Sequence, residues 1–490
     1  MKEKYKIFEN NDENQKRLDV LTSIKQLINK WQEEYAISKK KTTEILNADV
    51  YSFGSFRMGV HFPQTDMDLI CLFPLYITKD DFFNNFMPIL QKTPEVEEVL
   101  DVIDSRVPIL KLMYKGFQID LLYAAIDPSL LQSKKSLIKV LKDEAVFNKL
   151  CQHTQNSLNG FKATENMLKQ VPNIKRFRNT LRGVKLWAMR RGIYSHTFGY
   201  LGGISYAIMV AKICQDYPGL EVADLLYKFF EVYSEWKWLE AVSIKISKKK
   251  DKLNLNSLQV LNSVSNDPMI ILTPVNNPKN SAYRVTQFTF ETIIKELKRG
   301  FQLIKGLTPL TYKKIQTSLD QDETQPAADD ESKPQEEVPK KQNWCQLFKK
   351  CRFFGNFNHF IKIDIVSHEE EAHRKWLGYV ESTLRRLLIA LNDNKDIQEL
   401  RVYPRSFQRQ ETQLEQDKIL EGFNHCDTYF IGIKFIVTQS DESANQFDLR
   451  EPITHFCRLL EVWRVKKDIN NLRIIHLIKS QLPHQLVNSF

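Results

Sequence analysis

The sequence predicts an α+β multidomain protein of about three domains. At 490 residues and 42% hydrophobic side chains, the chain is too long for one ordinary core, at ~150 residues per domain. Strand-like and helix-like runs mix in the first part, helix-like runs dominate the middle, and the last part alternates short strands with two helices. Charged residues make up 27% of the chain and aromatic residues 11%, which is typical of folded proteins.

The first domain, residues 1–170, is predicted to combine a helix with short strands. Apolar residues recur at helical spacing before about Thr43: Leu18, Leu21, Ile24, Leu27, Ile28 and Trp31. β-like runs follow at Val50–Phe53, Met67–Phe73, Val107–Tyr114 and Phe117–Ala124. The last two runs flank Lys115-Gly116, a candidate hairpin turn. This mixture indicates an α/β or α+β domain.

The second domain, residues 171–319, is predicted to be mostly helical. Its clearest helix candidates are Ile174–Arg191, Leu201–Asp216 and Val222–Trp238. Residues 320–343 are acidic, rich in Gln and interrupted by Pro, so they bury too little apolar surface to offset the entropy of ordering. We therefore expect a flexible acidic linker there, and a plain spacer is favoured over a tethering or regulatory role.

The third domain, residues 344–490, has the element order of a ferredoxin-like fold. Its predicted strands and helices are Phe357–Val366, Glu370–Leu391, Ile397–Val402, Tyr429–Val437, Pro452–Val465 and Leu472–Ile478. Many RNA-binding modules share this order, but so do unrelated proteins, so the order alone leaves the function of this domain open.

The bulk composition indicates a soluble intracellular protein. The net charge of +10 and the pI of about 9.0 are compatible with a polyanionic partner. The 7 cysteines include no Cys-x-x-Cys pair, which favours a reducing compartment over a disulfide framework. The N-terminus lacks the apolar core of a signal peptide, and the most apolar run, Phe198–Val210, is shorter than the ~20 residues that span a bilayer.

Two carboxylates, Asp66 and Asp68, stand at the entry to a buried strand in the stretch TDMDLICLFP. Residues i and i+2 of a strand share a face, so both project together while Met67 and Leu69 turn into the core. Such carboxylates repel each other unless a cation neutralises them, and Mg²⁺ prefers oxygen ligands. A third, Asp120, lies in the apolar strand FQIDLLYA and needs a partner there. If the two strands are neighbours, the three carboxylates suffice for two metal ions bridging a phosphate.

Gly54-Ser55 supplies a candidate phosphate site shortly before the aspartates. Glycine lets the backbone turn tightly, and Ser55 is predicted to cap a helix that begins at Phe56, whose free N–H groups favour a phosphate. Taken alone, a Gly-Ser pair is more often only a turn, and an Asp-x-Asp pair is more often a solvated loop. Their combination with Asp120 in a strand favours a site for a metal and a phosphate.

These residues resemble the nucleotidyltransferase superfamily that includes DNA polymerase β, and most closely the eukaryotic nuclear poly(A) polymerases. The similar segments, in the order of that family, include FGSFRMGVH, TDMDLICLFP, VPILKLMYKGFQIDLLYA, FRNTLRGVKLWAMRRGIYSHTFGYLGGISYAIMVAKICQDYP and PMIILTPVNNPKNSAYRVT. QLFKKCRFFGNFNHFIKI and SQLPHQLV extend the resemblance to the last domain. The resemblance implies a nucleotidyltransferase mixed-sheet catalytic domain, a helical central domain that completes the ATP site, and an RRM-like domain.

The resemblance also implies an activity and a metal site. The family adds AMP from ATP to RNA 3′ ends without a template and releases pyrophosphate. By similarity, Asp66, Asp68 and Asp120 would be catalytic and would hold two Mg²⁺ ions, for which Mn²⁺ is an expected substitute. One ion would activate the 3′-hydroxyl, and the other would neutralise the leaving group of an in-line displacement at the α-phosphate.

Further residues match the nucleotide contacts of the family. Phe53, Gly54 and Ser55 match its nucleotide-binding turn. Lys185 and Tyr194 match residues that hold the triphosphate, and Gly203 and Ile204 match positions that pack against the adenine. Without the resemblance, Lys185 reads as a solvated helix lysine, and Tyr194 and Gly203 read as packing residues.

Three positions depart from the pattern of the family. His196 replaces a common Asn, and Asn276 replaces a common Tyr. Phe62 stands beside the expected triphosphate site, where a small or polar residue is common. These departures leave nucleotide preference open.

Two basic sets are expected to attract RNA phosphates: Lys175, Arg176, Arg178, Arg182, Arg190 and Arg191, and then Arg385, Arg386, Arg401, Arg405 and Arg409. HEEEAH, His368 to His373, is one residue too long for a zinc-protease motif, so no metal is expected there.

The remaining expectations rest mainly on the family. It implies a nuclear monomer that works with cleavage and polyadenylation factors on RNA, without a membrane. The chain ends soon after its third domain, so control by a long Ser/Thr-rich tail is not expected. Two alternatives stay open, a terminal uridylyltransferase of the same superfamily and a non-catalytic RNA-binding scaffold that keeps the fold.

Overall fold

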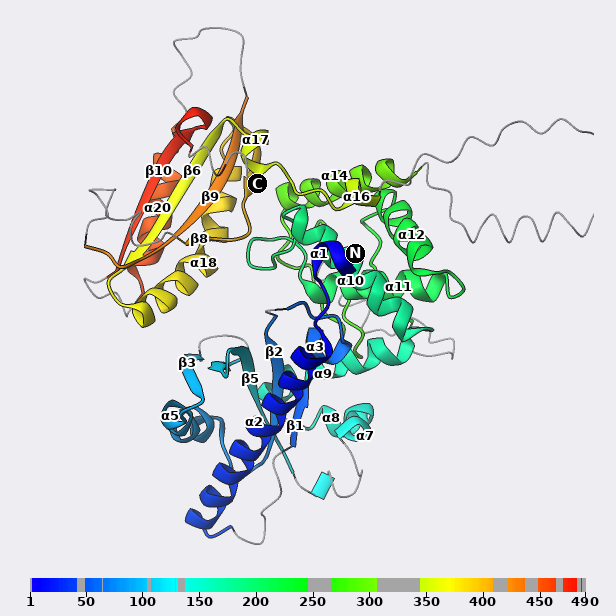
Figure 1. The fold of residues 1–490 in the computed structure, drawn as a ribbon, viewed down its shortest axis with the longest axis vertical. Coiled ribbons are helices and arrows are strands. Elements are labelled where there is room, and N and C mark those ends of the chain that lie inside the picture. Colours follow the sequence, from blue (N-terminus) through cyan, green and yellow to red (C-terminus); the bar gives the residue numbers. More distant parts are fainter. Residues whose placement is uncertain are drawn as a thin grey trace, which may run out of the picture.

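The computed structural model gathers the chain into three bodies, each built from one part of the sequence (Figure 1). It describes residues 2–41, 49–63, 65–103, 107–127, 129–130, 137–245, 266–305, 344–408, 422–436, 448–463, 470–482 and 486. The predicted linker, residues 320–343, and Arg409 lie outside the described residues, and the domain boundaries stay a prediction.

The first body is a five-stranded mixed sheet in the order β1-β2-β5-β4-β3. Its strands are β1 (Asp49–Ser52), β2 (Met67–Pro74), β3 (Val96–Val102), β4 (Ile109–Tyr114) and β5 (Phe117–Ile126). Only β2 and β5 pair in parallel, and β4 and β5 form a hairpin. The predicted turn at Lys115-Gly116 is confirmed, because both residues have positive φ values, 49° and 74°. The sequence reading missed β3, whose acidic residues obscure its apolar alternation.

Helices cover both faces of this sheet. They are α2 (Asn11–Ser38), α3 (Gly54–Met58), α4 (Lys79–Asp81), η2 (Phe82–Phe86), α5 (Met87–Lys92), α7 (Leu137–Lys142), α8 (Glu144–Phe147) and α9 (Gln152–Gln170). The short helix α1 (Lys2–Tyr5) instead lies beside the other two bodies, where Tyr5 packs against Phe348. Ile28 and Trp31 of α2 pack on one face with Leu69. Phe161 of α9 packs on the other with Ile70. Burial on both faces explains why β2 is apolar at nearly every position.

The second body is helical, as predicted. It contains α10 (Ile174–Arg190), α11 (Gly203–Asp216), α12 (Val222–Ser234) and α14 (Gln287–Ile304). Trp187 of α10 is fully buried against the edge of Phe230, with ring centroids 4.9 Å apart. The predicted helix from Val222 to Trp238 ends at Ser234, and Trp238 instead packs in the following loop, stacked on Tyr233.

The third body confirms the ferredoxin-like arrangement. Its five-stranded sheet has the order β10-β6-β9-β7, β8 pairs with β9, and all the described pairings are antiparallel. Its elements are α16 (Trp344–Leu347), α17 (Phe353–Asn356), β6 (His359–Ser367), α18 (Glu370–Asn392), β7 (Ile397–Val402), β8 (Phe407–Gln408), β9 (His425–Phe435), α20 (Arg450–Glu461), β10 (Asn470–Ile478) and η3 (Lys479–Gln481). The sequence reading missed the short β8 and started β9 four residues late.

The histidines of HEEEAH have separate structural partners. His373 is buried and bonds through Nε2 to Asp427 Oδ2 at 3.0 Å, whereas the His368 ring stacks on Phe423. His373 therefore links α18 to β9, whereas His368 and Phe423 stack between the segments that precede these two elements. Among the described helices, none is both long and apolar enough to cross a membrane.

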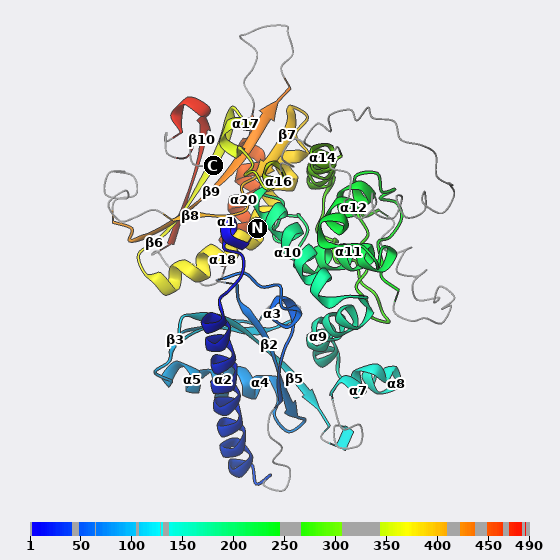
Figure 2. The ribbon, with the colours of Figure 1, turned by 45° about the vertical axis from the view of Figure 1, so that its right-hand side comes forward.

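Helix α18 of the third body lies over the sheet of the first body (Figure 2). Arg374 of α18 forms an ion pair with Glu98 of β3. The edge of the first sheet that is formed by β3 therefore contacts the third body.

Candidate active site

Neighbouring strands bring the three predicted carboxylates together. Asp68 of β2 lies directly opposite Asp120 of β5 in the parallel pairing, and Asp66 directly precedes β2. Ligand oxygens of the three residues all lie within 4.8 Å of one another. Met67 and Leu69 have no exposed surface, so the predicted alternation of the strand is confirmed.

The cluster is electrostatically costly without a cation. Burial, together with the negative charges of Asp66 and Asp120, raises the pKa of Asp68 to about 8. Burial also raises the pKa of Asp120, against the opposing effect of Lys111. A group of carboxylates that resists ionisation in this way has the donor chemistry of a divalent-cation site.

Lys111 is a site residue that the sequence reading missed. It lies opposite Asp120 on the hairpin partner β4, and its Nζ is 3.7 Å from Asp120 Oδ2. A lone lysine within the apolar run VPILKLMY was the available signal, since the hairpin register places it beside that aspartate. Its side chain is 49% exposed, so it faces solvent at the edge of the carboxylate cluster.

Gly54 fits its turn for two reasons. Its φ is +60°, and a Cβ on it would lie 2.2 Å from Asp68 Oδ2, a distance that no side chain tolerates. The predicted cap at Ser55 is wrong. Helix α3 begins at Gly54 with Phe53 as its N-cap, so Ser55 lies inside the first turn. The Gly54 N–H donates to Thr164 Oγ1 of α9 at 3.2 Å, which leaves the turn anchored to a helix instead of a serine cap.

A cavity of about 560 Å³ adjoins the carboxylates. Of the predicted site residues, all except Asp120 line it: Phe53, Gly54, Ser55, Asp66, Asp68, Lys185, Tyr194, Gly203 and Ile204. Its volume falls within the ~300–1,000 Å³ of typical ligand pockets. Its walls come from the first two bodies, so a bound ligand would contact both.

Helix α10 docks on the segment between α3 and β2 through three successive carbonyls. Arg178 Nε donates to Met58 O at 2.6 Å, and Arg182 Nη2 donates to Gly59 O at 2.5 Å. Lys185 Nζ donates to Val60 O at 3.0 Å. Because the spacing of 178, 182 and 185 follows one helix face, a single face of α10 fixes the segment that leads to Asp66. These two arginines, expected to contact RNA, are therefore engaged inside the protein.

Lys185 and Tyr194 are both strongly shielded from solvent. Burial lowers the pKa of Lys185 to about 8, although Asp66 and Asp68 favour its charged form. Its Nζ lies 4.9 Å from the centre of the Phe62 ring. Tyr194 stacks on Tyr206 with ring centroids 5.8 Å apart, and burial raises the pKa of its phenol. A buried ammonium facing two carboxylates across a cavity is suited to a polyphosphate.

Tyr194 is also held by close packing against the first turn of α11. A Cβ on Gly203 would lie 2.7 Å from the Tyr194 hydroxyl oxygen. Glycine at 203 therefore permits the close approach of this phenol to the helix, which gives a physical reason for the residue beyond general helix packing.

The three departures from the family pattern lie around the cavity and not within it. His196 and Asn276 are absent from the residues lining the 560 Å³ cavity, although Val275 and Asn277 line it. His196 packs on Tyr283 with ring centroids 5.2 Å apart. Burial, with Arg284 and Arg385 nearby, lowers its pKa to about 4, so it is neutral at pH 7.

Comparison with known protein families finds matches to poly(A) polymerase domains over most of the chain. The model for the poly(A) polymerase nucleotidyltransferase domain matches residues 2–171, and that for the poly(A) polymerase central domain matches residues 176–316. The model for the poly(A) polymerase predicted RNA binding domain matches residues 352–424 and 421–489.

Individual relatives agree with these matches. A poly(A) polymerase of Dictyostelium discoideum is 30% identical over 497 residues, which cover 98% of this chain and 55% of the relative. Nuclear poly(A) polymerase 4 of Arabidopsis thaliana is 30% identical over 486 residues, covering 97% and 59%. The chain thus spans little more than half the length of the curated relatives it matches.

Solved structures resemble the chain more distantly. A chain of Cid1, described as having RNA terminal uridylyl transferase activity, is 15% identical with a TM-score of 0.45, covering 71% of this chain and 95% of its own. A cytoplasmic RNA terminal U-transferase is 17% identical with a TM-score of 0.44, covering 71% and 95%. Similarity this low carries no argument about the nucleotide used.

Proposed function

The chain belongs to the poly(A) polymerase family, and on this premise we propose that it is a template-independent polynucleotide adenylyltransferase. It adds AMP from ATP to RNA 3′ ends by attack of the 3′-hydroxyl on the α-phosphate, and pyrophosphate leaves. The observation that carries the proposal is the convergence of Asp66, Asp68 and Asp120 beside a cavity that contains a buried lysine.

Divalent cations fit the carboxylate cluster. The donors are all carboxylate oxygens within 4.8 Å of one another, and burial with the neighbouring carboxylates raises the pKa of Asp68. Asp66, Asp68 and Asp120 would hold the ions, for which Mg²⁺ is our proposal and Mn²⁺ a substitute. When bound, such ions supply activation of the hydroxyl and neutralisation of the leaving pyrophosphate.

The side chains of the chain itself have three tasks in this scheme. The Lys185 ammonium, already fixed by Val60 O, binds the triphosphate and offsets part of its charge. Tyr194, held by Tyr206 and Gly203, orients the same group. Phe53, Gly54 and Ser55 shape the wall beside Asp68, and Gly203 and Ile204 form the surface against which the adenine packs.

Lys111 is proposed to act at the RNA side of the site. It is half exposed and lies beside Asp120, the carboxylate expected nearest the attacking hydroxyl. An ammonium there keeps Asp120 ionised and attracts the last phosphates of an RNA strand.

The rest of the assignment follows from the family. We propose that the third domain binds RNA, that the protein acts in the nucleus in mRNA polyadenylation with cleavage and polyadenylation factors, and that it is a monomer. Relatives named as nuclear poly(A) polymerases support this localisation. The boundaries proposed for the domains are 1–170, 171–319 and 344–490, with a linker between the last two.

One experiment tests the activity against its two alternatives. Purified protein is incubated with a labelled RNA, Mg²⁺ and each nucleotide triphosphate separately. Extension with ATP supports the adenylyltransferase, and preferred extension with UTP selects the terminal uridylyltransferase. RNA binding without extension by any nucleotide selects the non-catalytic scaffold.

A further inference from the structure

A second cavity, of about 400 Å³, lies where the three bodies meet. The N-terminal arm contributes Tyr5 to its wall, the end of α10 contributes Arg190, and the end of β7 with the residues after it contributes Arg405. Tyr5 is held there because the Arg190 guanidinium lies 4.9 Å from the centre of its ring. We refer to this cavity as the three-body pocket.

The lining of the three-body pocket is strongly cationic. Six basic side chains line it, and none of the described residues in its wall is acidic: Lys6, Arg190, Arg191, Lys350, Arg401 and Arg405. Low-dielectric walls lined by one sign of charge focus the potential inside a cavity. The pocket should therefore attract an anion.

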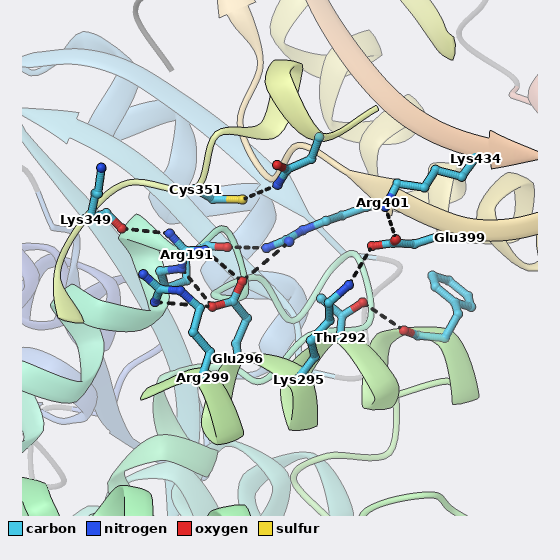
Figure 3. A network of polar contacts seen from close by, with 12 residues as sticks. Arg191, Thr292, Lys295, Glu296, Arg299, Lys349, Cys351, Glu399, Arg401 and Lys434 are labelled. Atoms are coloured by element: carbon cyan, nitrogen blue, oxygen red, sulfur yellow. Dashed lines mark hydrogen bonds and ion pairs between the residues drawn. The ribbon is translucent and has the colours of Figure 1, made fainter. Parts of the chain in front are cut away.

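The carboxylates behind the wall offset only part of this charge. Glu296 of α14 accepts two hydrogen bonds from Arg191, at 2.8 and 3.0 Å, and lies 3.7 Å from Arg401 Nη1 (Figure 3). Arg299 approaches the same carboxylate at 3.8 Å, so three guanidiniums surround one negative charge. The next carboxylate along, Glu399, already pairs with Lys434 and Lys295.

The guanidiniums are also fixed in direction. Arg191 Nη1 donates to Lys349 O at 2.9 Å, and Arg401 Nη2 donates to Arg191 O. Both arginines are more than nine-tenths buried. Because their N–H groups are engaged within the wall, these two guanidiniums supply positive charge to the pocket. Direct contacts to a phosphate would come from the exposed Lys6, Lys350 and Arg405.

Aromatic rings complete the wall. Tyr5, Phe62, Phe353 and Tyr403 line the pocket, and the two tyrosines are only partly buried. Rings beside arginines are the combination that proteins use to stack a base next to a bound phosphate. The chemistry of the wall thus matches a nucleotide better than an inorganic anion.

The pocket adjoins the candidate active site. Met189 lines both cavities, and the Phe62 ring, which lines the three-body pocket, lies 4.9 Å from the Lys185 ammonium of the other. A group bound here would lie one side-chain layer from the proposed triphosphate site.

We propose that the three-body pocket binds one nucleotide unit, an aromatic base with its phosphate. The unit is either a residue of the RNA strand or a free nucleotide. The first source rests on the proposed function, whereas the second does not. Because its walls come from all three bodies, an occupied pocket would hold the third domain against the other two.

The test uses a double substitution at the rim, Lys350→Gln with Arg405→Gln. Both side chains are exposed, so the fold should persist, which a thermal unfolding curve checks. The matched control, Lys298→Gln with Arg458→Gln, removes two exposed charges elsewhere. The probes are a labelled oligoadenylate, followed by fluorescence anisotropy, and 5′-AMP, followed by calorimetry, both without metal ions.

For the RNA source, we expect the rim variant to bind the oligoadenylate about tenfold more weakly, with the salt dependence of binding reduced by ~0.7 per lost phosphate contact. If the pocket takes a free nucleotide, we expect calorimetry to detect binding of 5′-AMP to the unaltered protein and no such binding to the rim variant. The control should bind both probes as the unaltered protein does.

Equal binding of both probes by the rim variant and the unaltered protein would overturn the proposal. Loss of binding in the control to the same extent would also overturn it, because net charge alone would then explain the effect. Neither readout requires catalysis. If the protein extends RNA normally but the rim variant binds the probes as tightly as the unaltered protein, only the pocket proposal is refuted. If the rim variant binds more weakly but the protein extends no RNA, only the proposed enzymatic activity is refuted.

Discussion

Asp68 and Asp120 lie directly opposite each other on the two strands of the sheet that pair in parallel. A parallel register of this kind aligns residues that are far apart in sequence, and Asp66 joins them two positions earlier on the same face. The two carboxylates therefore share one small volume, and burial raises the pKa of both, with a further contribution from the nearby charge of Asp66. A cation is the simplest means of making this arrangement favourable.

Asp68→Asn should uncouple the protein from divalent cations. We expect Mg²⁺ to raise the melting temperature of the unaltered protein by several degrees and to leave that of the variant unchanged, because ligand binding stabilises only a protein with an intact site. The metal-free variant should melt no lower than the metal-free original, since Asn has the size of the protonated Asp68 and removes a buried group that resists ionisation. Thermal melts with EDTA and with Mg²⁺ measure both effects, and an equal Mg²⁺ shift in both proteins would count against the site.

Gly203→Ala should impair the use of ATP. The added Cβ would meet the Tyr194 hydroxyl oxygen at 2.7 Å, so the tyrosine must move from its place beside the cavity. We expect kcat/KM for ATP to fall at least tenfold, because small misplacements of positioning groups are costly. Gly219→Ala is the matched control, since its Cβ would meet nothing within 4 Å. Similar kinetics for the two variants would contradict the role of this contact.

Lys185 should set an alkaline limit on the reaction. Its pKa is lowered to about 8, chiefly by burial, so the ammonium loses its proton as the pH rises through that value. We expect kcat/KM for ATP to decrease above about pH 8 as the charge is lost. Lys185→Arg keeps its charge at that pH, so its profile should lack this decrease even if its maximum is lower. The same decrease of kcat/KM at alkaline pH in both proteins would show that another group causes it.

Glu296→Gln should destabilise the junction of the second and third bodies. The buried carboxylate is the common partner of three arginines, and its loss leaves buried cations uncompensated. We expect the free energy of unfolding to fall by about 3 kcal/mol or more, as for other broken buried ion pairs. Glu291→Gln, on an exposed position of the same helix, should change it by less than about 0.5 kcal/mol. Urea unfolding curves compare the two.

Much of the fold follows from local patterns. The hairpin at Lys115-Gly116, the helix from Ile174 and the element order of the third domain all rest on short-range periodicity or turn chemistry, and each is confirmed. Strand β3 was missed because its residues Glu97, Glu98 and Asp101 interrupt the apolar pattern of an edge strand. Edge strands need only one buried face and so carry a weaker signal.

The candidate site could be predicted from the sequence where charged residues lie within apolar strands. Paired aspartates within apolar strands indicate a functional site, since a buried carboxylate requires a partner. The partners of Lys185 and Arg178 could not be predicted, because they are backbone carbonyls of a distant segment. Every residue has a backbone carbonyl, so the sequence does not indicate which ones serve as partners. The same reason hides the three-body pocket, whose walls meet only after all three bodies are packed.

The central claim is that three carboxylates and a neighbouring cavity transfer adenylate to RNA. The most direct measurement is extension of a short labelled RNA with Mg²⁺ and each nucleotide separately, beside the Asp120→Ala variant. We expect extension with ATP in preference to the other nucleotides, and loss of extension in a variant that still melts as a folded protein. Undiminished extension by Asp120→Ala, or no preference for ATP in the unaltered protein, would contradict it.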